Sequence, residues 1–335
     1  MKRLFTAAAS AAFLLAASGT LQAAAPKGYT LPTRDGRCAV WVTTEADPAP
    51  GESTTWSGEC RNGLAQGLGI QTLDRADRSG LRYVGHVRDG RWHGLGRLHQ
   101  FATDGGVLHV VEGVFEDGIE QGVFDELVMD HPQNVPLAAL RPPGREVGQV
   151  AVQVQQFYAD GAAVLMCAPE ADCAREAVTE GYDARRRPLG GDLDRVLPYG
   201  GWRLEVRDDR GLSQTGVCLD PSLVRPGHEP RVGRLLFPGF AAWQRPLGQD
   251  GLCDDLAASL VNGTLRWTSQ CQPARASERV RTTLQRSVSG PVVRSEIEEV
   301  LMRSGQEVSR TRRQVTARFL GACTADMRRV GQLEP

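Results

Sequence analysis

The sequence predicts a mainly β protein in which an array of β-hairpins is followed by a disulfide-bonded antiparallel β domain. Three observations lead to this prediction. A glycine frame occurs three times with a turn dipeptide in each copy, long stretches alternate apolar and polar residues, and eight cysteines can join strands to one another. With 335 residues, the chain is long enough for two domains.

The first 25 residues have the three parts of a secretory signal peptide. Lys2 and Arg3 precede an apolar run from Leu4 to about Ser18, and small residues follow up to Ala25. A membrane anchor is the alternative, but the run is short for a bilayer crossing and ends in an alanine-rich, cleavage-like site. No later apolar stretch approaches the ~20 residues of a span. We therefore expect a periplasmic or secreted protein that is not transmembrane after cleavage.

The formal net charge of −1 gives no overall attraction to nucleic acid, and we expect no nucleic-acid partner. The distribution of charge is less even. Residues 275–329 contain 12 arginines and 6 acidic residues, an excess of six positive charges. We interpret this bias as a solvated strand face, and an anion-binding patch is the alternative.

Three segments share one frame, in which an aromatic or apolar residue is followed two positions later by the first of three spaced glycines. The first glycines of the copies are Gly58, Gly85 and Gly113, so the period is 27 and then 28 residues. Gly58 and the later glycines of the first copy, Gly67 and Gly69, fall at strand positions. Glycine there is typical of close approach by another backbone, which stacked hairpins would supply.

The second glycine of each copy belongs to a dipeptide that favours a type I′ turn. That turn needs positive φ at both central residues and matches the twist of antiparallel strands. Each copy is therefore predicted to be a β-hairpin. The predicted turn pairs are Asn62-Gly63, Asp89-Gly90 and Asp117-Gly118.

The frame resembles the MORN repeat, a hairpin unit with the consensus Tyr-x-Gly-x-x-x-x-Gly-x-x-x-Gly-x-Gly. The resemblance covers about residues 56–125, with Trp56 or Tyr83 in the first position, whereas the third copy departs from the pattern with Val111 and Phe124. The resemblance implies a stacked hairpin sheet that can serve as an interaction surface. Spacing between copies exceeds that of the tightest arrays, which implies longer links between hairpins.

On this sheet, four residues are candidates for the interaction surface: Trp56, Tyr83, Trp92 and His93. For the aromatic residues, packing in the core is the alternative, because aromatic side chains at strand positions also stabilise sheets. His93 occupies a variable position of the frame where the other copies have Gln66 and Gln121. We therefore interpret it as a polar surface residue rather than as a metal ligand.

Cysteine spacing favours disulfides over a metal site. No pair has C-x-x-C spacing and no histidine lies near a pair as in a zinc finger, so we expect no metal and no cofactor. Eight cysteines admit 105 connectivities. We predict a bond between Cys38 and Cys60, which would join an N-terminal cap to the first repeat. Cys167 and Cys173 enclose five residues, which favours a local disulfide loop over two free or separately paired thiols.

We divide the chain into four parts: signal peptide 1–25, cap and three hairpin repeats 26–130, a proline-rich linker with an unassigned segment 131–195, and an antiparallel β domain 196–335. The linker has four prolines between positions 132 and 143, where they resist continuing a strand or helix. In the last part, alternating stretches bounded by Gly290 and Gly305 are typical of long antiparallel strands.

The last part is similar to an exported proteobacterial family known as domain of unknown function 3617, over about residues 196–328. The similarity rests on Gly201 and Trp202, Val-Cys-Leu at 217–219, Trp267 before Cys271, and Leu-Gly-x-Cys at 320–323. Arg318-Phe319 departs from the more usual Arg-Arg before Leu-Gly. The resemblance implies a small antiparallel β domain with two disulfides and no known reaction. Within it, we pair Cys253 with Cys271 and Cys218 with Cys323.

No catalytic motif stands out. The chain has no G-x-S-x-G elbow, P-loop, dinucleotide fingerprint or H-E-x-x-H. The adjacent carboxylates of Asp254-Asp255 and of Glu298-Glu299 point to opposite faces of a strand, which makes them poor acid–base pairs. We therefore predict a non-enzymatic binding or scaffolding protein of the cell envelope, with no catalytic residue, whose partner is a protein, a lipid or a cell-wall polymer. The alternatives are an exported hydrolase-like enzyme with a site formed by distant residues, and a small-ligand carrier in the C-terminal β domain.

Overall fold

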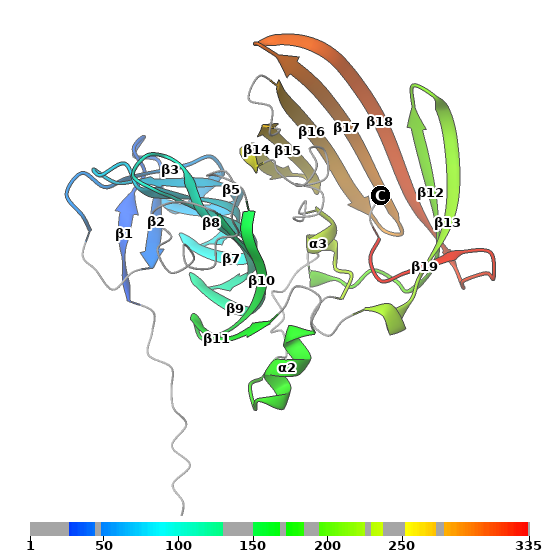
Figure 1. Cartoon of the computed structure of the whole chain (residues 1–335), viewed down its shortest axis with the longest axis horizontal. Helices are drawn as coiled ribbons and strands as arrows, with labels where there is room; N and C mark the ends of the chain where they lie inside the picture. The colour runs from blue at the N-terminus through cyan, green and yellow to red at the C-terminus, as the bar shows by residue number, and fades with distance from the viewer. Residues whose placement is uncertain are drawn as a thin grey trace, which may run out of the picture.

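The computed structural model describes residues 27–43, 48–129, 150–167, 172–183, 194–224, 229–236, 252–272 and 278–333. The predicted signal peptide and the proline-rich part of the predicted linker lie outside these residues. Within them the protein is mainly β, as predicted, and its strands form two large sheets (Figure 1).

The first sheet has eleven strands in the order β1-β2-β5-β6-β7-β8-β9-β10-β11, with β3 and β4 also pairing with β5. From β5 to β11, neighbours in the chain are antiparallel neighbours in the sheet, as hairpin repeats require. Its strands are β1 Gly28–Pro32, β2 Ala39–Thr43, β3 Ser53–Trp56, β4 Glu59–Arg61, β5 Leu64–Asp74, β6 Gly80–Arg88, β7 Arg91–Phe101, β8 Val107–Glu116, β9 Ile119–Met129, β10 Val150–Ala159 and β11 Ala162–Cys167.

The second sheet has eight strands in the order β14-β15-β16-β17-β18-β12-β13-β19. All its pairings are antiparallel except that of β13 with β19. Its strands are β12 Gly200–Asp208, β13 Gly211–Leu219, β14 Leu252–Val261, β15 Thr264–Gln272, β16 Glu278–Ser289, β17 Val292–Arg303, β18 Gln306–Gly321 and β19 Arg328–Val330. Three short helices complete the described fold: α2 Cys173–Thr179, η2 Pro221–Leu223 and α3 Val232–Leu236.

The three predicted turns have the backbone that their sequences favour. In each pair both residues have positive φ, for example 51° at Asn62 and 76° at Gly63. The turns are tied to one another, because the amide of Gly90 donates to the carbonyl of Ala65 and that of Gly118 to Trp92. The hairpins of the first sheet therefore stack through their turn glycines.

A fourth hairpin continues this series beyond the three copies found in the sequence. Strands β10 and β11 meet at Asp160 and Gly161, both with positive φ, and the amide of Gly161 donates to the carbonyl of Glu120. This segment lay in the part of the chain that the sequence left unassigned. The Asp-Gly pair was its signal, but the copy lacks the other two glycines of the frame.

Glycines outside the turns serve two different purposes. Gly67 has a φ of 77° and nothing within 4 Å of an added Cβ, so the expectation of close backbone approach is wrong there. Four others form a row across β5 to β8, since Gly69 pairs with Gly85, Gly85 with Gly96 and Gly96 with Gly113. A Cβ on Gly96 would lie 2.4 Å from the ring of Tyr83, because aromatic rings cover this row.

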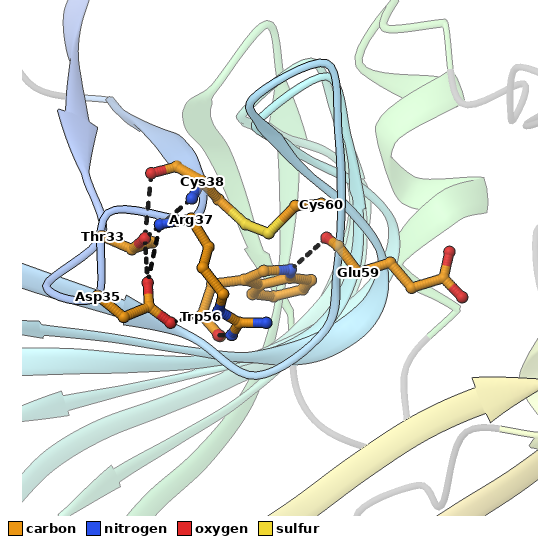
Figure 2. The surroundings of a disulfide bond; sticks show 7 residues. All are labelled: Thr33, Asp35, Arg37, Cys38, Trp56, Glu59 and Cys60. Carbon is orange, nitrogen blue, oxygen red and sulfur yellow. Dashed lines mark hydrogen bonds and ion pairs between the residues drawn. A yellow bond between two sulfur atoms is a disulfide. The ribbon is translucent and has the colours of Figure 1, made fainter.

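All four predicted disulfides are present, and no described cysteine is free. Around Cys38–Cys60, the Thr33 hydroxyl accepts from the amide of Cys38, and the indole of Trp56 donates to the carbonyl of Glu59 at 2.8 Å (Figure 2). The bond joins the loop before β2 to β4, and so ties the first two strands to the first hairpin.

Each sheet contributes one face to a shared core. Ile70, Val84 and Leu95 of the first sheet belong to the same buried cluster as Trp202 and Trp267 of the second. Helix α3 adds Val232, Leu235 and Leu236 to this cluster and lies between the two sheets (Figure 1). The opposite face of the first sheet has a core of its own, built from the aromatic residues of the hairpins.

Candidate functional site

The four residues predicted to form an interaction surface do not form one. Trp56, Tyr83 and Trp92 are buried, and the rings of Tyr83 and Trp92 stack with centroids 4.6 Å apart. Phe115 packs edge-on against both. Glycine at the paired strand positions leaves room for these rings, which therefore turn inward and stabilise the hairpin sheet instead of binding a partner.

His93 lies at the turn end of the hairpins with a side chain that is mostly buried. Its Nδ1 is 3.5 Å from a carboxylate oxygen of Asp117, which also accepts from Arg88. Burial, followed by the charge of Arg88, lowers the pKa of His93. Within the described ranges, His, Cys, Asp and Glu form no group of three or more that could hold a metal ion.

The most concentrated charges of the interior lie between the two sheets. Arg97 of β7 is fully buried and donates through Nε and Nη2 to one carboxylate oxygen of Glu112, at 3.0 and 2.7 Å. Its Nη1 donates to Asp255 of β14 at 3.2 Å. The other oxygen of Asp255 accepts from the indole of Trp267 at 2.8 Å, and His99 Nε2 lies 3.9 Å from the oxygen that Arg97 contacts. We call these five residues the inter-sheet cluster.

Burial governs the titration of the inter-sheet cluster. Desolvation raises the pKa of Glu112 to about 7, even though the charge of Arg97 opposes this shift. Burial also raises the pKa of Asp255 and lowers that of His99 well below its usual range. The guanidinium of Arg97, held between two carboxylates, stays charged.

The inter-sheet cluster is a connection rather than an accessible site. Arg97, His99 and Asp255 are each at most 1% exposed, and every charged group of the trio Arg97, Glu112 and Asp255 contacts another. From the sequence, Asp255 was considered only as part of the Asp254-Asp255 pair, and Arg97 was not identified. An arginine directly after a strand glycine, on the face where the neighbouring strands carry Ile70 and Val84, was the available signal.

The outer face of the second sheet is an accessible surface rich in arginine. It consists of the strand residues that alternate with the inward Trp202, Trp267, Leu284 and Ala317, and so point away from the shared core. On β12 and β15 to β18 this face carries nine exposed arginines and four glutamates, an excess of five positive charges. The arginines are Arg203, Arg207, Arg266, Arg279, Arg281, Arg294, Arg310, Arg312 and Arg318.

Two arginines at one end of this outer face, Arg310 and Arg312, are ion-paired. Glu298 accepts from Arg310 and Arg312 at 2.5 and 2.7 Å, and Glu307 accepts from Arg310 at 2.8 Å. The two bridges to Glu298 connect β17 with β18, whereas the Glu307–Arg310 bridge lies within β18. All of them are open to solvent, so each contributes little to stability.

At the other end, three arginines gather without such partners. Arg203 of β12 lies directly opposite Arg318 of β18, and Arg294 of β17 is one row away, opposite Thr316. None of the three bonds to a carboxylate among the described residues, and all three are exposed. Like charges directly opposite each other destabilise a sheet. We call these residues the arginine triad.

The fold and this surface define a class: a mainly β, disulfide-bonded protein with an arginine-bearing sheet face. No protein-family model matches the chain, and comparisons with curated proteins and with solved structures give no match either. In the part of the chain that the structure describes, every helix is too short or too polar to cross a membrane. The four disulfides indicate an oxidising compartment.

Proposed function

We propose that this chain is an exported, non-enzymatic binding or scaffolding protein of the cell envelope, and that MORN-type hairpins build its first sheet. In this proposal the hairpin sheet is not itself the contact surface, because its aromatic residues are buried. It supports the second sheet through the shared core, and the outer face of the second sheet meets the partner.

The arginine triad is the observation that carries this proposal. Three exposed guanidinium groups without carboxylate partners add repulsion to the sheet and contribute nothing to its core. A partner that brings negative charge would relieve the repulsion. The buried inter-sheet cluster, by contrast, has its charges engaged with one another and offers no group to a substrate.

A small-ligand carrier has less support. The inner face of the second sheet is covered by α3 and by apolar side chains of the first sheet, such as Ile70 and Leu95, which occupy the place where a carried ligand would lie. An enzyme would need a reactive group within reach of solvent. Among the described residues, neither the inter-sheet cluster nor the outer face presents a nucleophile hydrogen-bonded to a base.

Site-specific crosslinking in the envelope of the producing cell tests the proposal. A photo-reactive residue replaces Thr283 or Gln285, which are exposed on the outer face, or Ala76, which is exposed in the link between β5 and β6. We expect adducts of protein, lipid or polymer from the first two positions and none from Ala76. Adducts from all three positions, or from none, would argue against the outer face as a contact surface.

A further inference from the structure

We propose that the partner of the outer face is a bilayer of anionic phospholipids, and that the arginine triad is the centre of contact. This inference rests on the proposed export of the chain, because export separates it from nucleic acid. Three further observations support a lipid surface over a protein or a single small anion.

The first observation is the chemistry of the triad. A guanidinium group donates two parallel hydrogen bonds to phosphate and keeps its charge at every relevant pH. Arg203 and Arg318 are cross-strand partners, and Arg294 is diagonal to Arg318. Residues so placed lie within several ångströms of one another. Three positive charges are therefore concentrated where phosphate groups can lie between them. Opposite Arg203 on β13 is Gly216, so that neighbouring position has no side chain of its own to pair with the arginine.

The second observation is the extent of the charged face. The arginines are spread over five adjacent strands, from β15 through β16, β17 and β18 to β12. At about 4.8 Å between strands, the face spans roughly 19 Å. One inorganic phosphate would engage only a small part of this array. A membrane surface, where many phosphates lie side by side, can engage all of it.

The third observation is what the face lacks. Centres of protein–protein contacts are enriched in aromatic side chains and Met as well as in Arg, so an arginine there is expected to have aromatic or apolar neighbours. Exposed large apolar residues near this face lie at its margins, namely Leu212 near the start of β13, Val308 near the start of β18 and Leu320 near its end. The middle of the face, as far as the structure describes it, offers charge without an apolar anchor. Such a surface suits headgroup phosphates better than a protein interface.

Vesicle sedimentation tests this inference directly on the full exported chain. The variant replaces Arg203, Arg294 and Arg318 by Gln. The matched control replaces by Gln the exposed Arg34, in the turn between β1 and β2, and the exposed Arg61 and Arg88 of the first sheet, and so also removes three positive charges. Non-reducing mass spectrometry and thermal melting verify that both variants retain four disulfides and fold. A third variant replaces the triad by Lys and keeps the charge.

We expect the wild-type chain to sediment with vesicles that contain phosphatidylglycerol and not with pure phosphatidylcholine. Loss of the triad should weaken this partitioning on the order of 100-fold, since each of the three arginines near an anionic surface contributes about fivefold. The control variant and the Lys variant should retain most of the binding. Binding should also weaken as salt rises, because exposed charges are screened.

Four results would contradict the inference. Equal binding to neutral and anionic vesicles would show that negative lipid charge is not needed. If the Gln variant bound as strongly as the wild type, the triad would not be the centre of contact. Competition by millimolar inorganic phosphate alone would assign the triad to a small anion. A protein adduct at Thr283 without vesicle binding would contradict only this inference, whereas vesicle binding in vitro without any adduct in the envelope would contradict only the proposed function.

Discussion

Arg97 and Asp255 lie 158 residues apart in the chain and form a fully buried ion pair, with 3.2 Å between Nη1 and Oδ2. The pair connects β7 of the first sheet with β14 of the second. Removing two charges from water is costly unless they meet in good geometry, so this pair constrains how the two sheets pack.

Breaking this pair should destabilise the protein strongly. Arg97→Met leaves the carboxylates of Glu112 and Asp255 buried without their cation, and we expect a loss of about 3–5 kcal/mol in the free energy of unfolding. Urea denaturation of purified protein measures it. The double variant with Asp255→Leu should lose less than the two single variants combined, because the second substitution removes one uncompensated charge.

Arg210→Gln is the matched control for that experiment. Arg210 pairs with Asp208 at 2.8 Å, but its side chain is 91% exposed, so its loss should change stability much less than the loss of Arg97. Equal effects of Arg97→Met and Arg210→Gln would show that the buried pair does not hold the sheets together.

Stability should depend on pH through Glu112. Burial raises its pKa in the folded chain to about 7 from an ordinary value of 4.5. Between these values the folded state binds a proton that the unfolded state has lost, so the contribution of this group is full below pH 4.5 and falls as pH rises through 7. His99 and His86 have lowered pKa values and oppose this trend, since they disfavour folding as pH falls below 6.5.

Glu112→Gln separates the two effects, because it removes the carboxyl and leaves both histidines. We expect the difference in the free energy of unfolding, wild type minus variant, to decrease from pH 4.5 to pH 7 and to level off above it. Chemical denaturation across this range provides the measurement. A difference that does not vary with pH would mean that Glu112 titrates alike in the folded and unfolded chain.

Substitutions at two glycines should destabilise the protein for different reasons. Gly63→Val forces a β-branched residue into a φ of 76° with no steric neighbour, whereas Gly96→Ala places a methyl group against the ring of Tyr83. We expect losses of at least 1–2 kcal/mol at Gly63 and about 1–3 kcal/mol at Gly96, by thermal or urea unfolding.

Rescue variants distinguish the two mechanisms. Gly63→Asn should lose less than Gly63→Val, since asparagine tolerates positive φ. Tyr83→Leu should offset part of the Gly96→Ala loss and none of the Gly63→Val loss. Rescue of Gly63→Val by Tyr83→Leu would mean that the turn and the strand glycines are not independent.

The disulfides should differ in how much they contribute to the stability of the protein. Cys218 and Cys323 are separated by 105 residues, whereas Cys167 and Cys173 are separated by 6. In the chain-entropy account, closing a loop of about 100 residues stabilises by about 4.7 kcal/mol, and shorter loops contribute less. Replacing the first pair by Ala should therefore lower the melting temperature more than replacing the second. The reverse order would show that local strain or packing outweighs chain entropy.

The repeat turns and the cysteine pairs could be predicted from the sequence. Asn62-Gly63 predicts its own backbone because positive φ at two adjacent residues is a local property. The fourth turn, at Asp160 and Gly161, was missed because this segment has the turn dipeptide but not the other glycines of the frame. Its membership in the series is visible only in the amide of Gly161, which bonds to Glu120 of the preceding hairpin.

The role of the aromatic residues could not be predicted in the same way. Trp56, Tyr83 and Trp92 occupy strand positions, and alternation places them on one face without saying whether that face meets solvent. Burial followed from the cap strands and from neighbouring rings such as Phe115. The excess of arginine after residue 275 was likewise visible, but Arg203 precedes that stretch and joins Arg318 only through sheet pairing.

By itself, the sequence determined the strand-rich character of the chain, its hairpin turns and the redox chemistry of its cysteines, because each depends on a residue's own backbone or on its immediate neighbours. Only the tertiary structure decided which faces are buried, that Arg97 meets Asp255, and that three arginines share one exposed patch. Those properties depend on register and packing between segments distant in the chain, where the free energy of burial and the Coulomb interaction act through space and not along the sequence.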